Sequence, residues 1–338
     1  MITPKRTPWQ PDEWQRFLRE AFRQPQALLS HLDLPAAALT PDLQPDFAML
    51  VPAPFAARMN PADPKDPLLR QVLPLQQERD ENLGFVADPL GETEAQLGFK
   101  RAPTLIQKYR GRVLMITTPG CAVNCRYCFR RHFPYQDHRP EGHGEALEVI
   151  AGDASISEVI LSGGDPLLLG DAQLARLIDD ICAIAHVRRI RLHSRLPIVL
   201  PQRVTQALLE SLAASRCSVT IVVHCNHAQE LDEDTARAFA CLREVGVHLL
   251  NQTVLLHGVN NEADILCELS EMLFKQGALP YYLHMPDPVT GTAHFMVSDA
   301  EAQPLYEAMR ERLPGYLLPR LVREEPGEVS KTALAFNN

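Results

Sequence analysis

The sequence predicts an α/β fold, a TIM-like partial (βα)6 barrel with an N-terminal helical cap. From Arg112 onward, β-branched apolar runs alternate with segments of helical period, which is the pattern of βα units. Parallel strands joined by right-handed crossovers curl into a barrel, and chemistry then belongs at the carboxyl ends of the strands. The main motifs of this chain follow predicted strands directly, which agrees with that architecture.

The barrel elements can be placed individually. The six strands are expected at Arg112–Thr117, Glu158–Leu161, Arg189–His193, Ser218–His224, Val247–Leu255 and Pro280–His284. The five helices between them are expected at Gly144–Ile150, Asp171–His186, Pro201–Ser215, Asp232–Val245 and Glu262–Gln276.

The N-terminal third differs in composition from the rest of the chain: half of the 28 prolines fall in the first 100 residues. Short helical runs there, such as residues 12–22, are separated by breakers such as Pro61-Ala62-Asp63-Pro64-Lys65-Asp66-Pro67. We therefore expect three regions: a proline-rich helical region at residues 1–106, the barrel at residues 107–318, and a C-terminal segment at residues 319–338.

Composition limits the class of partner. A chain of 338 residues with 46% hydrophobic content can bury a sizeable core. Its formal net charge of −9 gives no global basic field, so we expect a small molecule or a protein as partner and no nucleic acid. No stretch approaches the roughly 18 apolar residues of a membrane helix, and the first six residues lack the apolar run of a secretory signal. We expect a cytoplasmic protein with no membrane association.

Three of the eight cysteines lie within eight residues, in Cys121-Ala122-Val123-Asn124-Cys125-Arg126-Tyr127-Cys128, directly after the first predicted barrel strand. Three thiolates at this spacing can bind three irons of a four-iron cluster and leave the fourth iron open to a reactant. Zinc is the alternative, because His132 could complete a four-ligand shell. The other five cysteines are scattered and are expected to be ordinary buried residues: Cys182, Cys217, Cys225, Cys241 and Cys267.

The cysteine motif, with Tyr127 before its last cysteine, resembles that of the radical S-adenosylmethionine (SAM) superfamily. The resemblance implies a [4Fe–4S] cluster on Cys121, Cys125 and Cys128 whose open iron binds SAM. One electron from an external reductant would then release a 5′-deoxyadenosyl radical. The segment Ser162-Gly163-Gly164-Asp165-Pro166 resembles the glycine-rich segment that binds the amino group of SAM, so Tyr127, Gly163, Gly164 and Asp165 are assigned to the SAM site. A turn that requires glycine is the alternative for this segment.

From Tyr109 to Lys331 the chain further resembles the lysine 2,3-aminomutases. The similar segments are, in order, Cys128-Phe129-Arg130-Arg131, Arg195-Leu196-Pro197, Pro201-Gln202-Arg203, His224-Cys225-Asn226-His227 and Asn251-Gln252-Thr253-Val254-Leu255-Leu256. The resemblance places His224 and Gln252 at the SAM site and implies pyridoxal 5′-phosphate (PLP), held as a Schiff base on Lys331. A solvated surface lysine is the alternative for Lys331. In Pro326-Gly327-Glu328-Val329-Ser330-Lys331 the glycine run of the family is interrupted before this lysine.

The resemblance also implies how free L-lysine is bound. Arg130 is expected to hold the α-carboxylate by two parallel hydrogen bonds. Asp287 and Glu324 are expected to hold the distal ammonium, although the family has an aspartate where Glu324 stands. In the implied reaction the deoxyadenosyl radical removes a hydrogen from the β-carbon, the nitrogen moves from the α- to the β-carbon, and (S)-α-lysine becomes (R)-β-lysine.

Within this family, the proline-rich N-terminal region and the ending Arg-Glu-Glu-Pro-Gly-Glu-Val-Ser-Lys, seven residues from the last residue, resemble the bacterial aminomutase of translation elongation factor P β-lysylation. A functional link to that factor and to its β-lysine ligase is therefore expected. A free-lysine 2,3-aminomutase of amino-acid metabolism is the alternative enzyme. An iron–sulfur electron carrier or structural protein is the alternative of another class, and it would have a closed cluster and no Schiff-base lysine.

Overall fold

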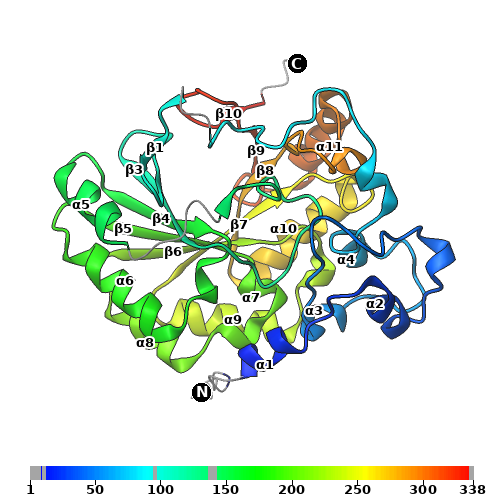
Figure 1. Ribbon diagram of the computed structural model, residues 1–338, viewed down its shortest axis with the longest axis horizontal. Helices are drawn as coiled ribbons and strands as arrows, with labels where there is room; N and C mark the ends of the chain where they lie inside the picture. The colour runs from blue at the N-terminus through cyan, green and yellow to red at the C-terminus, as the bar shows by residue number, and fades with distance from the viewer. Residues whose placement is uncertain (1–8, 10–12, 94–96, 136–142, 335–338) are drawn as a thin grey trace.

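The computed structural model describes residues 9, 13–93, 97–135 and 143–334. Its centre is one ten-stranded sheet whose strand order follows the chain from β1 to β10. Strands β3 to β9 pair in parallel, and two antiparallel strands extend the first edge while one extends the last. The order ends at β1 and β10, so the sheet is an open, partial barrel (Figure 1). The predicted α/β fold class is confirmed.

All six predicted strands are present, and their ends differ from the predicted ones by at most two residues. They are β3 (Arg112–Thr118), β4 (Glu158–Gly163), β5 (Arg189–Ser194), β6 (Ser218–His224), β7 (His248–Val254) and β8 (Leu279–His284). The five predicted helices correspond to α5 (Gly144–Gly152), α6 (Asp171–Ala183), α8 (Gln206–Ala214), α9 (Glu233–Glu244) and α10 (Ala263–Gln276). They cover the outer face of the curved sheet (Figure 1).

The helix predicted from Pro201 to Ser215 starts later than expected. Pro201–Arg203 forms a separate 3-10 turn, and α8 begins after Thr205. The hydroxyl of Thr205 accepts a hydrogen bond from the amide of Leu208 at 3.2 Å, so Thr205 is the N-cap that fixes this boundary.

Several elements lie outside the predicted pattern. They are β1 (Lys100–Ala102), β2 (Leu105–Ile106), α7 (Leu196–Val199), α11 (Asp299–Arg312), β9 (Arg320–Arg323) and β10 (Thr332–Ala333). The extra strands are two to four residues long, so pairing rather than local sequence determines them. Helix α11 contains Pro304 in its first half, which weakens its helical signal.

The two faces of the barrel strands differ in chemistry. In β5, Ile190 and Leu192 are buried in the main apolar core together with residues of α6 and α8. Arg191 and His193 alternate with them and therefore lie on the opposite, inner face. Burial of each such Ile or Leu between the sheet and the outer helices stabilises the fold by about 1.5–3 kcal/mol. The inner face of this strand carries polar side chains instead.

The N-terminal region packs across the barrel through short helices: α1 (Glu13–Arg19), α2 (Pro25–His31), α3 (Ala53–Ala56) and α4 (Pro67–Arg70). The helical run expected at residues 12–22 is α1. Buried Asp66 caps α4, accepting from the amides of Leu68 at 2.9 Å and Leu69 at 2.8 Å. The three predicted regions and their boundaries stay a prediction, and residues 1–106 include two short strands besides helices.

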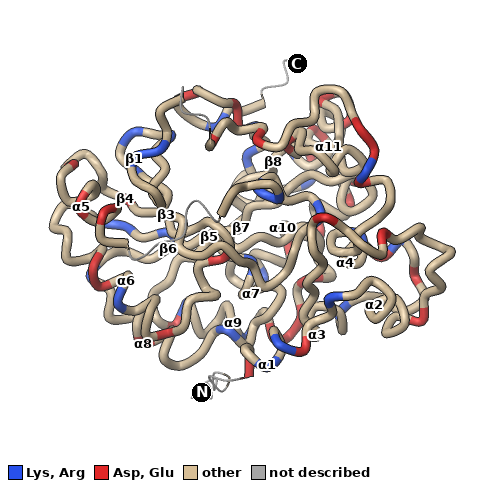
Figure 2. Tube along the Cα trace, viewed as in Figure 1, with Lys and Arg blue, Asp and Glu red and all other residues tan. Residues whose placement is uncertain are grey.

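Charge is spread over the whole fold. Figure 2 shows Lys and Arg interspersed with Asp and Glu along the trace rather than gathered on one element. Among the described residues, no helix is both long enough and apolar enough to cross a membrane.

Candidate active site

The three motif cysteines lie in one loop after β3, at the carboxyl edge of the sheet. Cys121, Cys125 and Cys128 are unpaired thiols of intermediate exposure. Burial raises the pKa of Cys121 well above its ordinary value, and the nearby Cys128 and Cys125 raise it further, so the three thiols are neighbours. His132 is engaged elsewhere, with Nε2 3.1 Å from the carbonyl oxygen of Thr290. Its ring therefore has a protein partner outside the cysteine loop.

The cysteine loop is fixed by the N-terminal region. The amide of Asn124 donates to the Leu50 carbonyl at 3.1 Å, and the amide of Arg126 donates to the Gln71 carbonyl at 2.8 Å. These backbone bonds join the loop to residues of the N-terminal region that are distant in the sequence, so the N-terminal region helps to hold the loop in place.

Two arginines, one within the cysteine loop and one three residues after it, share one carboxylate. Arg126 contacts Glu78 with Nε at 2.9 Å and Nη2 at 2.5 Å, and Arg131 contacts it at 2.7 Å. Burial acts to raise the pKa of Glu78, but the two arginines lower it below its ordinary value. Glu78 therefore stays ionised and ties the loop to the cap.

The glycine-rich segment meets the cysteine loop backbone to backbone. The amide of Gly164 donates to the Thr118 carbonyl at 2.7 Å, and a Cβ on Gly164 would lie 1.9 Å from the Gly120 oxygen. Gly163 has φ +111°, and a Cβ there would lie 2.8 Å from the Ile116 side chain. Close backbone approach at Gly164 and the positive φ of Gly163 thus explain both glycines.

We expect Gly164→Ala to destabilise the protein by about 1–3 kcal/mol, because the new Cβ collides with backbone that cannot move aside. Gly152→Ala is the matched control, since its Cβ meets nothing within 4 Å. Urea unfolding monitored by circular dichroism measures both. Equal stability of the two variants would show that the segments do not pack as described.

Asp165 is held by protein groups. Its Oδ1 accepts from the hydroxyl of Ser194 at 2.8 Å, and its Oδ2 accepts from the amides of Arg195 at 2.8 Å and Leu196 at 3.2 Å. The carboxylate thereby ties the end of β4 to the end of β5. Its assignment to the SAM site stays a prediction, and its side chain is saturated with partners inside the protein.

The inner face of the barrel carries a row of uncharged imidazoles. His224 of β6 lies 2.9 Å from the Gln252 amide of β7, and its ring centre is 6.0 Å from that of His193. Burial lowers the pKa of His224 to about 3, and burial also lowers the pKa of His193 and His284 well below the ordinary value. Neutral rings can donate and accept without adding charge, which suits contact with a cationic cofactor such as a sulfonium.

A chain of alternating charges runs across the open side of the barrel. Arg130 contacts Glu92 through Nε at 2.6 Å and Nη2 at 2.8 Å, and Lys108 bridges Glu92 at 3.0 Å and Glu324 at 2.9 Å. The second oxygen of Glu324 lies 2.5 Å from Nζ of Lys331. Burial acts to raise the pKa of Glu324, but Lys331 and Lys108 lower it well below its ordinary range. The structure therefore links Arg130, Glu324 and Lys331 in one chain of ion pairs, and their role in a substrate site stays a prediction.

Lys331 is positioned by a hairpin. Its neighbour Thr332 pairs with Arg323 in the β9–β10 ladder, which sets Lys331 opposite Glu324. In the connecting loop the amide of Glu328 bonds to the Glu325 carbonyl, and Pro326-Gly327 with φ +84° at the glycine makes a type II turn. This turn requires only Gly327, so the interrupted glycine run does not prevent the lysine from reaching the site. The Lys331 side chain is only 20% exposed, unlike a solvated surface lysine.

Asp287 lies beyond the end of β8, facing the same charges. Burial raises its pKa to about 7, the negative charge of Glu324 raises it too, and Lys331 and Lys108 act in the opposite direction. Two carboxyl groups with different affinity for protons thus share one site: Glu324 is ionised, while Asp287 titrates near neutrality.

Other site residues escaped the sequence analysis. Glu92 and Lys108 lie in segments without a motif, and only their ion pairs reveal them. Tyr127, which was assigned to the SAM site, accepts a hydrogen bond from Asn226 at 2.7 Å and packs edge-on against Phe295.

Residues 115–269 match the family described as the Radical SAM superfamily. The partial barrel, the cysteine loop after its first parallel strand and this match define the class: the chain is a radical SAM enzyme, a class that uses a [4Fe–4S] cluster and SAM.

The chain is 49% identical to "L-lysine 2,3-aminomutase" of Escherichia coli (strain K12), covering 85% of this chain and 83% of that one. It is 44% identical to the protein of that name from Haemophilus influenzae, covering 95% of each, and 35% identical to the one from Clostridium subterminale, covering 84% of this chain and 68% of that one. The chain belongs to the L-lysine 2,3-aminomutase family, isomerases of the radical SAM superfamily.

Proposed function

We propose that this protein is a PLP-dependent radical SAM enzyme that converts L-lysine to (R)-β-lysine. The observation that carries the proposal is the placement of Lys331. The β9–β10 hairpin brings its amine to Glu324, 5.7 Å from the centre of the Tyr282 ring, at the sheet edge that also holds the cysteine loop. An electron carrier with a fully ligated cluster would not require a partly buried lysine at this position.

The residues present fit the two radical cofactors. Cys121, Cys125 and Cys128 are free thiols that interact electrostatically with one another, and they are proposed as the ligands of the cluster. SAM would lie against the glycine segment, with the neutral His224 and Gln252 at the barrel interior as further partners.

The surroundings of Lys331 also fit PLP. A phosphate requires cationic partners, and Lys108 and Arg112 are the proposed ones. Lys108 contacts Oε1 of Glu324, the oxygen that does not contact Lys331. The guanidinium of Arg112 lies 4.6 Å from the centre of the Tyr109 ring. Glu324 holds Nζ of Lys331 in place through its Oε2 at 2.5 Å. When bound, SAM on the cluster supplies a carbon radical, and PLP supplies a π-system to the migrating nitrogen.

The substrate carboxylate is assigned to Arg130 with one change to the expected geometry. Glu92 occupies Nε and Nη2 of the guanidinium, while Nη1 has a single 3.4 Å contact with the hydroxyl of Ser162. Nη1 is therefore proposed to bind the carboxylate by one ionic hydrogen bond, instead of the two parallel bonds that the sequence implied.

Asp287 and Glu324 are proposed to bind the distal ammonium. Glu324 holds one lysine amine on each of its oxygens, so a glutamate at this position is able to bind ammonium groups. Two carboxyl groups around one cation favour lysine over glutamate, whose distal charge is opposite.

Asp287→Asn is expected to lower kcat/KM for lysine about ten- to a hundredfold, because a charge-assisted bond in a partly buried site contributes about 1.5–3 kcal/mol. Glu324→Gln should act in the same direction. Steady-state anaerobic kinetics measure both effects, and uncoupled cleavage of SAM should be unchanged in Asp287→Asn. Wild-type lysine kinetics in that variant would show that other groups bind the ammonium.

The pH profile gives an independent test of Asp287. Its pKa of about 7 means that the ionised, ammonium-binding form increases between pH 6 and 8, while the distal amine of lysine stays protonated. Catalytic efficiency should therefore rise over this range and level off above it. Asp287→Asn should remove the rise. Glu324→Gln should retain a rise displaced to lower pH, because the charge of Glu324 helps to raise the Asp287 pKa. An unaltered profile in both variants would contradict the assignment.

We further propose that the product serves β-lysylation of translation elongation factor P in the cytoplasm. The support is the resemblance in the C-terminal segment and in the proline-rich N-terminal region. The test is an anaerobic incubation with lysine, SAM, PLP and dithionite, chiral analysis of the product, and then addition of the β-lysine ligase and the factor. (R)-β-Lysine and a β-lysyl mass increase on the factor are expected. Formation of (S)-β-lysine, or of a product that the ligase rejects, would favour free-lysine metabolism instead.

A further inference from the structure

We propose that Arg195 is a positioning residue for the iron–sulfur cluster: its guanidinium holds the Cys125 thiolate by an ionic hydrogen bond and raises the reduction potential of the cluster. The inference rests on the proposed assignment of the cluster to Cys121, Cys125 and Cys128.

Arg195 reaches the cysteine loop from the end of β5. It follows the last residue of that strand, and its amide is held by Asp165 at 2.8 Å. The side chain is 5% exposed, and Nη1 lies 2.7 Å from Sγ of Cys125. A buried guanidinium therefore touches a proposed cluster ligand.

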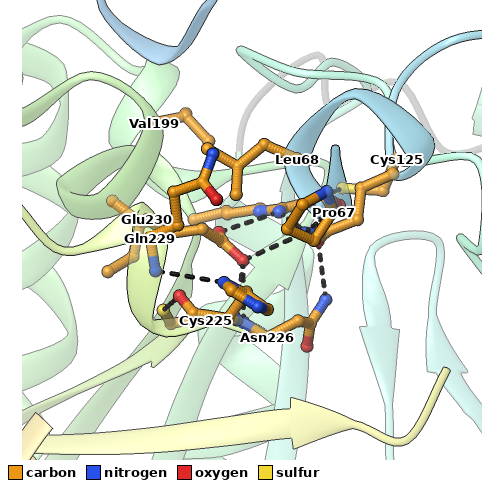
Figure 3. Close-up of polar contacts among 12 residues, drawn as sticks. Pro67, Leu68, Cys125, Val199, Cys225, Asn226, Gln229 and Glu230 are labelled. Carbon is orange, nitrogen blue, oxygen red and sulfur yellow. Dashed lines mark hydrogen bonds and ion pairs between the residues drawn. The ribbon is translucent and has the colours of Figure 1, made fainter. Parts of the chain in front are cut away.

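The orientation of the guanidinium is fixed, because its second terminal nitrogen, Nη2, is also hydrogen-bonded. Nη2 donates to Oε1 of Gln71 at 2.7 Å and to Oε2 of Glu230 at 3.0 Å. Glu230, 0% exposed, in turn accepts from the amide of Asn226 at 2.9 Å through its other oxygen. Figure 3 shows Glu230, Asn226 and Cys125 around this buried network, with dashed lines along its contacts. Nε has no partner among the described residues, so one donor is left over at the site.

A donor with this charge has a definite electrostatic effect. Reduction adds one negative charge to the cluster, and a hydrogen bond to a ligand sulfur stabilises the more negative state. An arginine keeps its charge even when buried. Glu230 offsets part of that charge, but the N–H directed at Cys125 remains. Loss of the guanidinium should thus make the cluster harder to reduce, whereas a purely structural link between cap and barrel would leave the potential where it is.

The experiment compares three reconstituted holoenzymes with wild type. Arg195→Gln is combined with Glu230→Gln, so that no uncompensated charge stays buried. Arg195→Lys retains the charge without the planar fork. Arg203→Lys is the control, since Arg203 is a fully buried arginine that pairs with Asp171 at 2.7 Å and stacks on Trp14, without contact to a cysteine. Iron content and the midpoint potential from an EPR-monitored redox titration are measured for each, with circular dichroism of the iron-free proteins.

In the double variant the one-electron reduction equilibrium should shift about tenfold against the reduced state, roughly 59 mV more negative. Arg195→Lys should shift less, and Arg203→Lys should match wild type. Loss of iron from folded Arg195 variants but not from Arg203→Lys would also support the positioning role. If the double variant fails to fold, the iron content and midpoint potential of Arg195→Lys test the proposal instead. Wild-type iron content and potential in the Arg195 variants would overturn the proposal, whereas a wild-type protein without a four-iron cluster would overturn the proposed function itself.

Discussion

Replacing any one of Cys121, Cys125 or Cys128 with Ala is expected to abolish SAM cleavage. The remaining two thiolates leave an iron of the cluster without its protein ligand, and such a cluster is expected to be labile. Iron content after anaerobic reconstitution and the yield of 5′-deoxyadenosine with dithionite measure the effect.

The matched control is Cys267→Ala, a buried cysteine of α10 remote from the loop. This variant should retain iron and cleavage. The cluster assignment would fail if all three loop variants kept normal iron content and normal deoxyadenosine yield.

Lys331→Ala is expected to eliminate covalently bound PLP and β-lysine formation while leaving the cluster intact. The two sites come from separate parts of the sequence: the loop follows β3, whereas Lys331 lies beside β10. Borohydride reduction followed by peptide mapping measures the covalent attachment, and iron analysis of the same sample measures the cluster.

Lys275→Ala is the control, because Lys275 is an exposed lysine in the last turn of α10. It should still be labelled at Lys331. Full labelling of the Lys331→Ala protein would show that another lysine is the anchor and would contradict the assignment.

The parallel core of the fold was predictable because each βα unit carries its own signal. Strand β6 agrees with its predicted bounds at both ends, since Ser218–His224 is a run of β-branched residues. The edge strands were not predictable in this way. β10 has two residues, and only its pairing with β9 makes it a strand. Helix α11 had an unused signal, the capping box in which Ser298 and Glu301 satisfy each other's backbone amides.

In the candidate site, too, residues with a local sequence signal were predictable, and residues that depend on distant contacts were not. The cysteines and Lys331 were found because a motif or a position singles them out. Glu92 and Lys108 were not, since their importance comes from charges that lie far away in the sequence, on Arg130 and Glu324. Sequence alone also could not show that Glu92 takes up two of the Arg130 donors.

The central claim is that one barrel end joins SAM cleavage to the rearrangement of lysine. It is tested most directly by incubating the reconstituted enzyme with lysine carrying two deuterium atoms on its β-carbon, and by locating the label with mass spectrometry. Because the deoxyadenosyl radical takes its hydrogen from that carbon and returns one after the nitrogen has moved, deuterium should appear both in 5′-deoxyadenosine and at C2 of β-lysine. Deoxyadenosine free of deuterium, together with unchanged lysine, would show that SAM cleavage in this protein serves a different reaction.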